Sequence, residues 1–303
     1  MELSSIVFTQ VLIIFVLLIL GVVLTKIGMI KDSGLKQITD ILLYAVTPCL
    51  VVNAYQKDFS KELASGLLAS VAFSVLFHII SILICTVCFK REETKRYRVS
   101  IFSSVYSNCG YMAIPLLTAA LGSDGVFYGS AYLAVFTVFY WTHGICVYKG
   151  DMSELSFKKL LKNPGLIGTF IALLLFLLGI KLPYVIGESV KHMANLNTPL
   201  AMIVMGAYLA KTDFKKALTN ISVYIVSILR LIVLPIVAVL MIKVMGLSDI
   251  VAKSVLITAA CPTAAVTTLL AAKYNLDASY SAEVVAVSTV FSIITIPLVL
   301  MLI

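Results

Sequence analysis

The sequence predicts an all-α integral membrane protein with ten transmembrane helices in two inverted five-helix repeats, whose helices 4 and 9 are broken where they cross. This prediction depends on the composition, the spacing of the apolar segments and an internal repeat. Of 303 residues, 61% are hydrophobic and 13% are charged, and the mean hydropathy is +1.06. Soluble domains carry about 25% charged residues. We therefore expect a multi-pass protein of the cytoplasmic membrane.

Ten apolar segments are each long enough to cross a bilayer, since a helix needs about 20 apolar residues to span about 30 Å of hydrocarbon. The first lacks the basic residues that precede a cleavable signal sequence, so we expect it to be retained. The longest connection, 149–163, leaves no room for a soluble catalytic domain. The predicted spans are 6–25, 37–55, 64–89, 99–121, 126–148, 164–182, 194–210, 219–242, 251–272 and 281–302.

Lysine and arginine are distributed unequally between the two sets of alternate loops, with sixteen in one set and six in the other. Because cytoplasmic loops carry the excess of basic residues, the first set is predicted to be cytoplasmic and both termini extracytoplasmic. The net charge of +8 follows from this topology and from anionic lipid headgroups, so we expect a lipid bilayer and no nucleic acid as partner.

An internal repeat relates the two halves of the chain, with three matches at nearly one offset and in the same span order. The matches are Gly28 with Gly179 and Thr47-Pro48 with Thr198-Pro199, both at an offset of 151, and AVFTVF (134–139) with AVSTVF (286–291) at 152.

A repeat with five spans enters the membrane from the opposite side the second time, so the two repeats are inverted. Inverted repeats are typical of transporters that work by alternating access. We predict a first repeat at 1–148, a cytoplasmic linker at 149–163 and a second repeat at 164–303.

The fourth and ninth spans contain helix-breaking residues at membrane depth. The fourth reads SNCGYMAIP at 107–115, and the ninth reads ITAACPTAAVTT at 257–268. Pro115 and Pro262 each remove a backbone donor, and Gly110 is expected to let the chain leave helical geometry before Pro115. Such backbone persists in a membrane only where protein, water or a ligand satisfies the freed groups. The alternative is a pair of proline kinks relieved by neighbouring helices.

Two interrupted helices that cross near the bilayer centre would present their half-helix N-termini to a bound anion, and this polarity suits a carboxylate. Asn108 can donate its amide to the same anion, with Tyr111, Thr263 and Thr267 as further polar candidates. Thr47 and Asn53 would lie beside the site on the second span, or Thr47-Pro48 is a structural kink alone.

Arg230 lies near the middle of the eighth span, where a charged side chain is expected to face the bundle interior or a water-filled cavity. It can balance the charge of a substrate, pair with a carboxylate such as Glu283, or serve as a structural cation bonded to carbonyls. For Asp40 and Glu283, near the ends of their spans, we favour a solvated or capping role. His78 and His143 are expected to be packing residues, with a proton relay as the alternative.

The interrupted segments 99–121 and 254–272 contain no Asp or Glu, which disfavours a cation/proton antiporter. A sodium-coupled symporter stays open, because carbonyls and hydroxyls can bind sodium. The six cysteines are expected to be small buried side chains and not disulfides or metal ligands.

These motifs, in this order, resemble the auxin efflux carrier family over essentially the whole chain. The resemblance is carried by NCGYMAIPL at 108–116, by Pro262 and by SIITIP at 292–297. It implies a fold similar to that of sodium–bile acid symporters and sodium/proton antiporters, with spans 1, 2, 6 and 7 as a scaffold and spans 3–5 and 8–10 as a transport domain. It also implies a homodimer and small organic-anion substrates such as auxins, malate or malonate. The short central loop resembles that of bacterial members.

The expected function is therefore secondary transport of a small organic anion by an elevator-like alternating-access movement, with no enzymatic activity, cofactor or metal. A sensor that binds a small molecule without moving it is the rival of a different class. The expected substrate-binding residues are Thr47, Asn53, Asn108, Cys109, Gly110, Tyr111, Pro115, Arg230, Pro262, Thr263 and Thr267.

Overall fold

The structure is a computed structural model that describes residues 3–89, 95–150 and 164–303. The elements of these residues are helical, apart from one isolated β-bridge between Ser107 and Thr263. The predicted linker 149–163 falls almost entirely outside the described residues.

The first half of the chain consists of α-helices with three one-turn π-helical segments, labelled η. They are α1 (Leu3–Lys26), α2 (Asp32–Ile41), η1 (Leu42–Val46), α3 (Thr47–Ala54), α4 (Lys61–Cys88), α5 (Lys95–Val105), η2 (Cys109–Ala113), α6 (Ile114–Phe139), η3 (Tyr140–Gly144) and α7 (Ile145–Lys149).

The second half has one further π-helical segment. Its elements are α9 (Pro164–Leu177), α10 (Tyr184–Asn195), α11 (Asn197–Leu209), α12 (Phe214–Thr219), α13 (Ile221–Ile228), η4 (Leu229–Val233), α14 (Leu234–Met245), α15 (Asp249–Ala260), α16 (Val266–Lys273) and α17 (Ala278–Leu300).

Within the described residues, six helical segments are long and apolar enough to cross a membrane, and one of them, Cys109–Lys149, is kinked at Gly122. This agrees with the predicted all-α integral membrane protein. The six helices are Phe8–Lys26, Asp32–Ala54, Lys61–Cys88, Cys109–Lys149, Ile221–Met245 and Ala278–Leu300.

The remaining predicted spans are not continuous helices of that length, and each has a local reason. The fourth and ninth spans are interrupted near their middle, at 106–108 and 261–265. The seventh is divided at Leu196 because Pro199, which has no N–H to donate, is placed in the first turn of α11. The sixth corresponds to α9, which has 14 residues.

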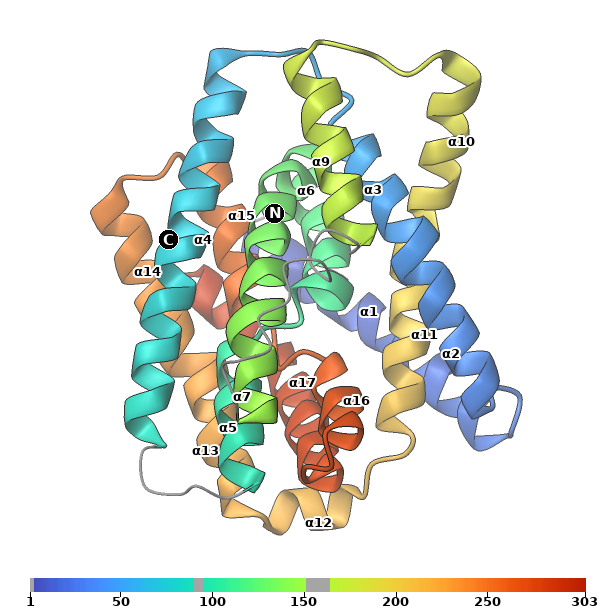
Figure 1. Ribbon diagram of the computed structural model, residues 1–303, viewed down its shortest axis with the longest axis vertical. Coiled ribbons are helices and arrows are strands. Elements are labelled where there is room, and N and C mark those ends of the chain that lie inside the picture. The colour runs from blue at the N-terminus through green and yellow to red at the C-terminus, as the bar shows by residue number, and fades with distance from the viewer. Residues whose placement is uncertain (1–2, 90–94, 151–163) are drawn as a thin grey trace.

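Two sets of helices lie on opposite sides of the helices at the centre of the molecule (Figure 1). Helices α2, α3, α10 and α11 lie on one side, and α4, α13 and α14 lie on the other. The long helix α1 packs along α11, where Gly21 and Gly206 allow close contact, since a methyl group at either position would overlap the backbone of the facing helix. Small residues permit this approach in membrane helices. The packing fixes α11 beside the break in the fourth span.

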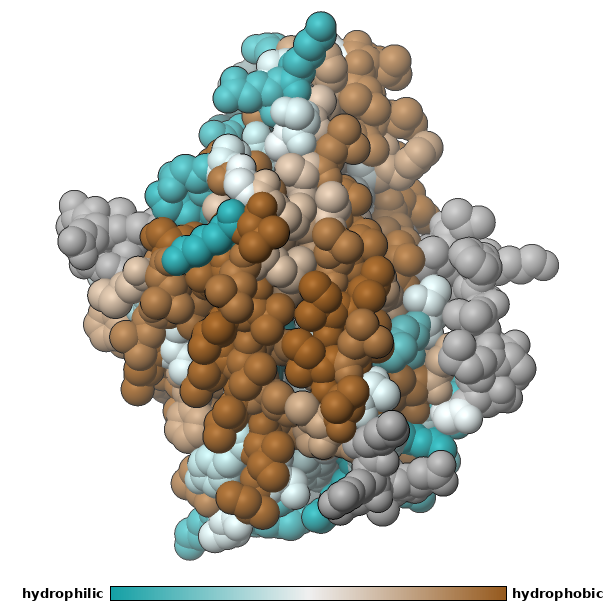
Figure 2. All heavy atoms as spheres, turned by 90° about the vertical axis from the view of Figure 1, so that its left-hand side faces the viewer, coloured by the Kyte–Doolittle hydropathy of each residue, from teal (hydrophilic) through white to brown (hydrophobic). Residues whose placement is uncertain are grey.

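The outward surface is apolar where lipid would contact it. Figure 2 shows a broad hydrophobic face on the side where α4, α13 and α14 lie, with hydrophilic residues mostly towards its two ends. On α14 the exposed side chains include Ile236, Leu240 and Val244. An apolar belt of this kind is stable against lipid tails and not against water.

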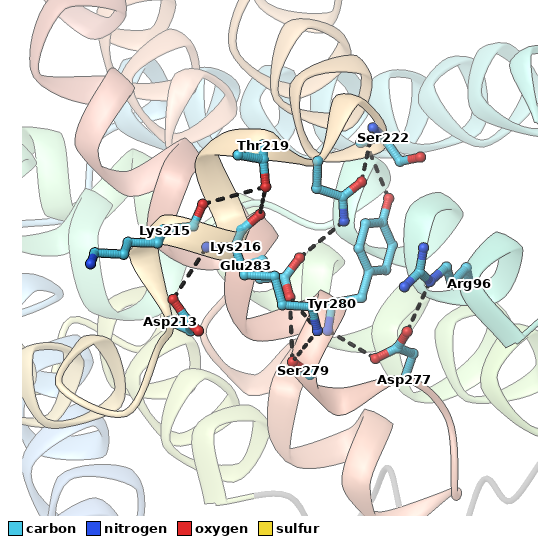
Figure 3. A network of polar contacts seen from close by, with 11 residues as sticks. Arg96, Asp213, Lys215, Lys216, Thr219, Ser222, Asp277, Ser279, Tyr280 and Glu283 are labelled. Carbon is cyan, nitrogen blue, oxygen red and sulfur yellow. Dashed lines mark hydrogen bonds and ion pairs between the residues drawn. The ribbon is translucent and has the colours of Figure 1, made fainter.

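A polar network joins α5, α12 and α17 at the end of the molecule where α12 lies (Figures 1 and 3). Arg96 Nε donates to Asp277 Oδ2 at 2.9 Å, and Lys216 Nζ lies 3.1 Å from Glu283 Oε1. Asn220 Nδ2 also donates to Glu283, at 3.0 Å. The Glu283 side chain is only 2% exposed, so the expected solvated or capping role is wrong. Asp40 is exposed, as expected.

Candidate functional site

The two interrupted spans cross at their breaks. The Asn108 N–H donates to the Pro262 carbonyl at 2.7 Å, and the Ala264 N–H donates to the Tyr106 carbonyl at 3.0 Å. These two bonds lie on either side of the antiparallel bridge between Ser107 and Thr263. The freed backbone groups of one break are thus satisfied by the other, which is the condition for irregular backbone at membrane depth.

The two prolines have different roles, which corrects the expectation for the fourth span. Pro262 lies within the break that follows α15, but Pro115 lies in the first turn of α6, beyond η2. The chain leaves helical geometry before Gly110, so this glycine does not start the break. Because η2 is a π-helical turn, the missing N–H of Pro115 is tolerated without a second interruption.

A cavity of about 220 Å³ opens beside the crossing, and we call it the crossover cavity. Typical ligand pockets are about 300–1,000 Å³, so this volume favours a small ligand. It is lined by Leu43, Tyr44, Thr47, Ser107, Asn108, Gly110, Tyr111, Leu133, Ala134, Phe136, Thr137, Tyr140, Trp141, Gly165, Thr169, Ala264, Ala265 and Val266.

The polar part of the crossover cavity is formed by two helix starts. Asn108 and Gly110 line it where η2 begins, and Ala265 and Val266 line it where α16 begins. The first N–H groups of a helix have no acceptor within the helix and carry partial positive charge. Two such ends at one cavity suit a carboxylate or another small anion.

The rest of the crossover cavity is apolar and aromatic. Its walls include Tyr44, Tyr111, Phe136, Tyr140 and Trp141. No charged side chain lines it among the residues that the structure describes. An anion bound there would be held by N–H groups and hydroxyls, and its apolar part would contact the rings.

Asn108 lies at the centre of the site and is almost fully buried. Its backbone N–H belongs to the crossing, and its side-chain Nδ2 donates to the Met205 sulfur of α11 at 3.1 Å. A thioether is a weak acceptor. The amide can therefore turn to a stronger acceptor that enters the cavity.

Four of the predicted binding residues line the crossover cavity: Thr47, Asn108, Gly110 and Tyr111. The other seven lie outside its lining. Thr263 Oγ1 donates to the Ser103 carbonyl at 2.8 Å, and the Thr267 hydroxyl donates to the Ala264 carbonyl. The remaining ones are Asn53 on α3, Cys109 in η2, Pro115 in α6, Arg230 in η4 and Pro262 in the break.

Several lining residues were not predicted from the sequence, including Tyr44, Trp141, Thr137 and Thr169. Tyr44 precedes Thr47 by three residues, about one helical turn, so the helical period could have indicated it. Thr169 comes from α9, which packs against α3. A contact between helices so far apart in the chain leaves no signal in the local pattern.

Arg230 and the two histidines occupy different surroundings. Arg230 is fully buried and donates to the carbonyls of Ser104, Val105 and Ala259, and not to Glu283. His78 Nδ1 lies 2.7 Å from the Ser74 carbonyl, and His143 Nδ1 lies 2.9 Å from the Tyr106 hydroxyl. Of the alternatives for Arg230, bonding to carbonyls is the one that the contacts support.

Comparison with known proteins gives consistent matches over nearly the whole chain. A family model described as "Membrane transport protein" matches residues 6–154 and 148–300. The chain is 25% identical to an uncharacterized transporter of Methanocaldococcus jannaschii over 308 residues, which cover 95% of this chain and 96% of the relative. It is 21% identical to an uncharacterized transporter of Methanothermobacter thermautotrophicus over 297 residues, 95% of each chain.

Proposed function

Since the chain belongs to the membrane transport protein family of the auxin efflux carrier type, we propose that it is a secondary transporter for a small organic anion, most simply a carboxylate. The observation that carries the proposal is the crossover cavity, where the N-terminal ends of two half-helices and Asn108 meet aromatic walls. Such ends face anionic substrate groups in transporters built from discontinuous helices.

We further propose that the anion moves by alternating access between two inverted repeats. The reciprocal bonds at the crossing support this arrangement, since each break pairs with the other. The left-handed Gly28 and Gly179, which follow α1 and α9, support it as well. In this proposal α1–α3 and α9–α11 form the scaffold, and α4–α7 and α12–α17 move against it.

The cavity contains wall residues from both proposed parts. Tyr44 and Thr169 come from the scaffold, and Phe136 and Tyr140 come from the moving part. A shift between the two parts would therefore open and close the cavity while the crossing, which lies wholly within the moving part, stays intact.

The proposal is tested by thermal unfolding of the detergent-purified protein against a panel of small aliphatic and aromatic carboxylates. A ligand that binds the folded state at 100 times its Kd stabilises it by about 2.7 kcal/mol. We expect at least one carboxylate to raise the Tm of the wild type and to have a much smaller effect on Asn108→Ala. Asn195→Ala, an exposed change of the same kind on α10, is the matched control and should respond like the wild type.

Flux into proteoliposomes then separates transport from binding. Saturable uptake of the stabilising acid supports the carrier. If the acid stabilises wild type and Asn108→Ala equally, the cavity is the wrong site. If it binds but never crosses the membrane, the protein is a sensor and not a carrier.

A further inference from the structure

We propose that Arg230 is a positioning residue that takes the place of a coupling cation: its guanidinium holds the C-terminal ends of the two half-helices at the crossing, so that anion transport needs no bound sodium ion. The transport part of this statement rests on the proposed function. The part about Arg230 rests on its contacts alone.

The contacts join three separate segments. Arg230 lies in η4, in the middle of the helix Ile221–Met245. Its Nη1 donates to the carbonyls of Ser104 at 3.1 Å and Val105 at 2.9 Å, and its Nη2 donates to the carbonyl of Ala259. Ser104 and Val105 end α5, and Ala259 is the penultimate residue of α15. One planar guanidinium thus binds the ends of both half-helices.

The last four carbonyls of α5 can all be assigned to protein donors. Phe102 accepts from the Tyr106 N–H at 3.0 Å, and Ser103 accepts from Thr263 Oγ1 at 2.8 Å. Ser104 and Val105 accept from Arg230. These four carbonyls are the groups that a helix leaves without partners. A cation that sought the carbonyls of Ser104 and Val105 would have to displace Arg230.

The positive charge of Arg230 matches the partial negative charges of the two helix ends that it binds. A helix C-terminus carries roughly −0.5 elementary charge, so two ends together carry about −1, opposite to the single positive charge of the guanidinium. Arg230 is fully buried and forms no ion pair with the described carboxylates. A buried charge at this depth requires a partner. The two helix ends supply it.

The contacts of Arg230 bear on whether anion transport is coupled to the binding of a cation. In transporters of discontinuous helices, freed carbonyls and half-helix C-terminal ends coordinate Na⁺ or H⁺, while half-helix N-termini face the anion. Here Arg230 binds carbonyls at the C-terminal ends of both α5 and α15, and it does not line the crossover cavity. The N-terminal side remains available for the anion. The chain itself thus supplies the cation that a symporter would take from solution.

The first test needs no substrate and compares Tm values in sodium chloride and in choline chloride at equal ionic strength. We expect the wild-type Tm to be the same in both salts. In choline chloride, the Tm of Arg230→Gln should be about 5 °C or more below that of the wild type. Sodium chloride should restore at least half of that loss, because sodium ions can bind the carbonyls that Arg230 no longer occupies. Lys243→Gln removes an exposed cation from the same helix and is the matched control, with no change in either salt.

Two results would overturn the inference. One is a saturable rise of the wild-type Tm with sodium, and the other is an Arg230→Gln protein that sodium stabilises no more than choline does. If Arg230→Gln does not fold, Arg230→Lys replaces it, and a point charge should keep part of the Tm. An Arg230→Lys protein that also fails to fold would contradict the role of the positive charge. An Arg230→Lys protein with the wild-type Tm would contradict the requirement for a guanidinium fork.

Flux experiments distinguish this inference from the proposed function. Carboxylate uptake that proceeds equally with external sodium or external choline supports both the proposed function and the role of Arg230. Uptake that requires sodium keeps the transporter and removes the role of Arg230. If no carboxylate is taken up but the Tm results are as expected, the proposed function fails and the assignment of Arg230 remains.

Discussion

Two arginines lie at opposite ends of α5 and are neutralised in different ways. Arg96, in the first turn, is half exposed and binds the Asp277 carboxylate. Arg230 binds the last turn from a neighbouring helix and is fully buried among carbonyls. A cation is unfavourable at a helix N-terminus and favourable at a C-terminus. Arg96 therefore needs a carboxylate, whereas Arg230 is balanced by the helix ends themselves.

The difference shows how this chain holds charge at two depths. At the end where α12 lies, Arg96 and Lys216 are half exposed, so water screens these cations and they form ion pairs with Asp277 and Glu283 (Figure 3). At the crossing, a carboxylate would also have to be desolvated. Backbone carbonyls carry partial charge without that cost.

The largest expected effect comes from removing Arg230, and removing Arg96 is the comparison. Arg230→Met leaves three buried carbonyls without their donor and should cost about 3 kcal/mol or more of unfolding free energy, since each unpaired group costs about 1–3 kcal/mol. Arg96→Met breaks an exposed pair and should cost less than about 1 kcal/mol. Thermal unfolding in detergent measures both. Equal losses of unfolding free energy in the two variants would show that the burial of the arginine does not decide how much it stabilises the fold.

The sequence predicted which segments are interrupted, but not which backbone groups Arg230 binds at the interruptions. The lack of Asp and Glu in 99–121 and 254–272 was visible at once. The partners of Arg230 were not, because any residue type has a carbonyl. Main-chain acceptors become available only where a helix ends, and the end of α5 lies some residues before the Gly110 and Pro115 that indicated a break.

The residues that line the crossover cavity could likewise be predicted only where a local sequence motif indicates them. Asn108, Gly110 and Tyr111 came from one local motif with unusual residues, so the sequence could place them. Tyr44 and Thr169 come from helices that meet only through tertiary packing. Glu283 is buried because Lys216 and Asn220 of the second half fold over it, and its position near a span end gave no sign of that.

A second experiment asks whether a buried carboxylate at the network behaves like the buried arginine at the crossing. Glu283→Gln keeps an acceptor for Asn220 but loses the ion pair with Lys216, and we expect a loss of about 1.5 kcal/mol. Glu188→Gln breaks an exposed pair with Lys191 on α10 and should change the Tm very little. Equal Tm values for the two variants would contradict the role of burial.

A smaller effect is expected from a neutral bond at the crossing. Thr263→Val removes the hydroxyl that donates to the Ser103 carbonyl while keeping the shape of the side chain. We expect a loss of about 1 kcal/mol, a typical value for one hydrogen bond. Thr263→Ser retains the hydroxyl and should keep most of the stability. If the serine and valine variants unfold at the same temperature, the bond does not hold the crossing.

The smallest effect is the acid sensitivity of the Arg96–Asp277 pair. Partial burial acts to raise the pKa of Asp277, but hydrogen bonds from the Tyr280 N–H and from Arg96 outweigh it and lower this pKa below the usual 3.8. A carboxyl with a lowered pKa adds stability above its unfolded value, and this stability is lost as the pH falls through the folded value. The pair is half exposed, so the contribution should stay below about 1 kcal/mol.

Asp277→Asn isolates that charge, because asparagine caps a helix about as well as aspartate and can still accept from the Tyr280 N–H. We expect the wild type to unfold at a slightly higher temperature than Asp277→Asn at pH 6, and the two Tm values to converge as the pH falls below about 3.8. In an Arg96→Met background the difference at pH 6 should shrink, since the partner charge is gone. A Tm difference that widens on acidification would mean that Asp277 does not act through Arg96, and the two ends of α5 would then not be neutralised by different kinds of group.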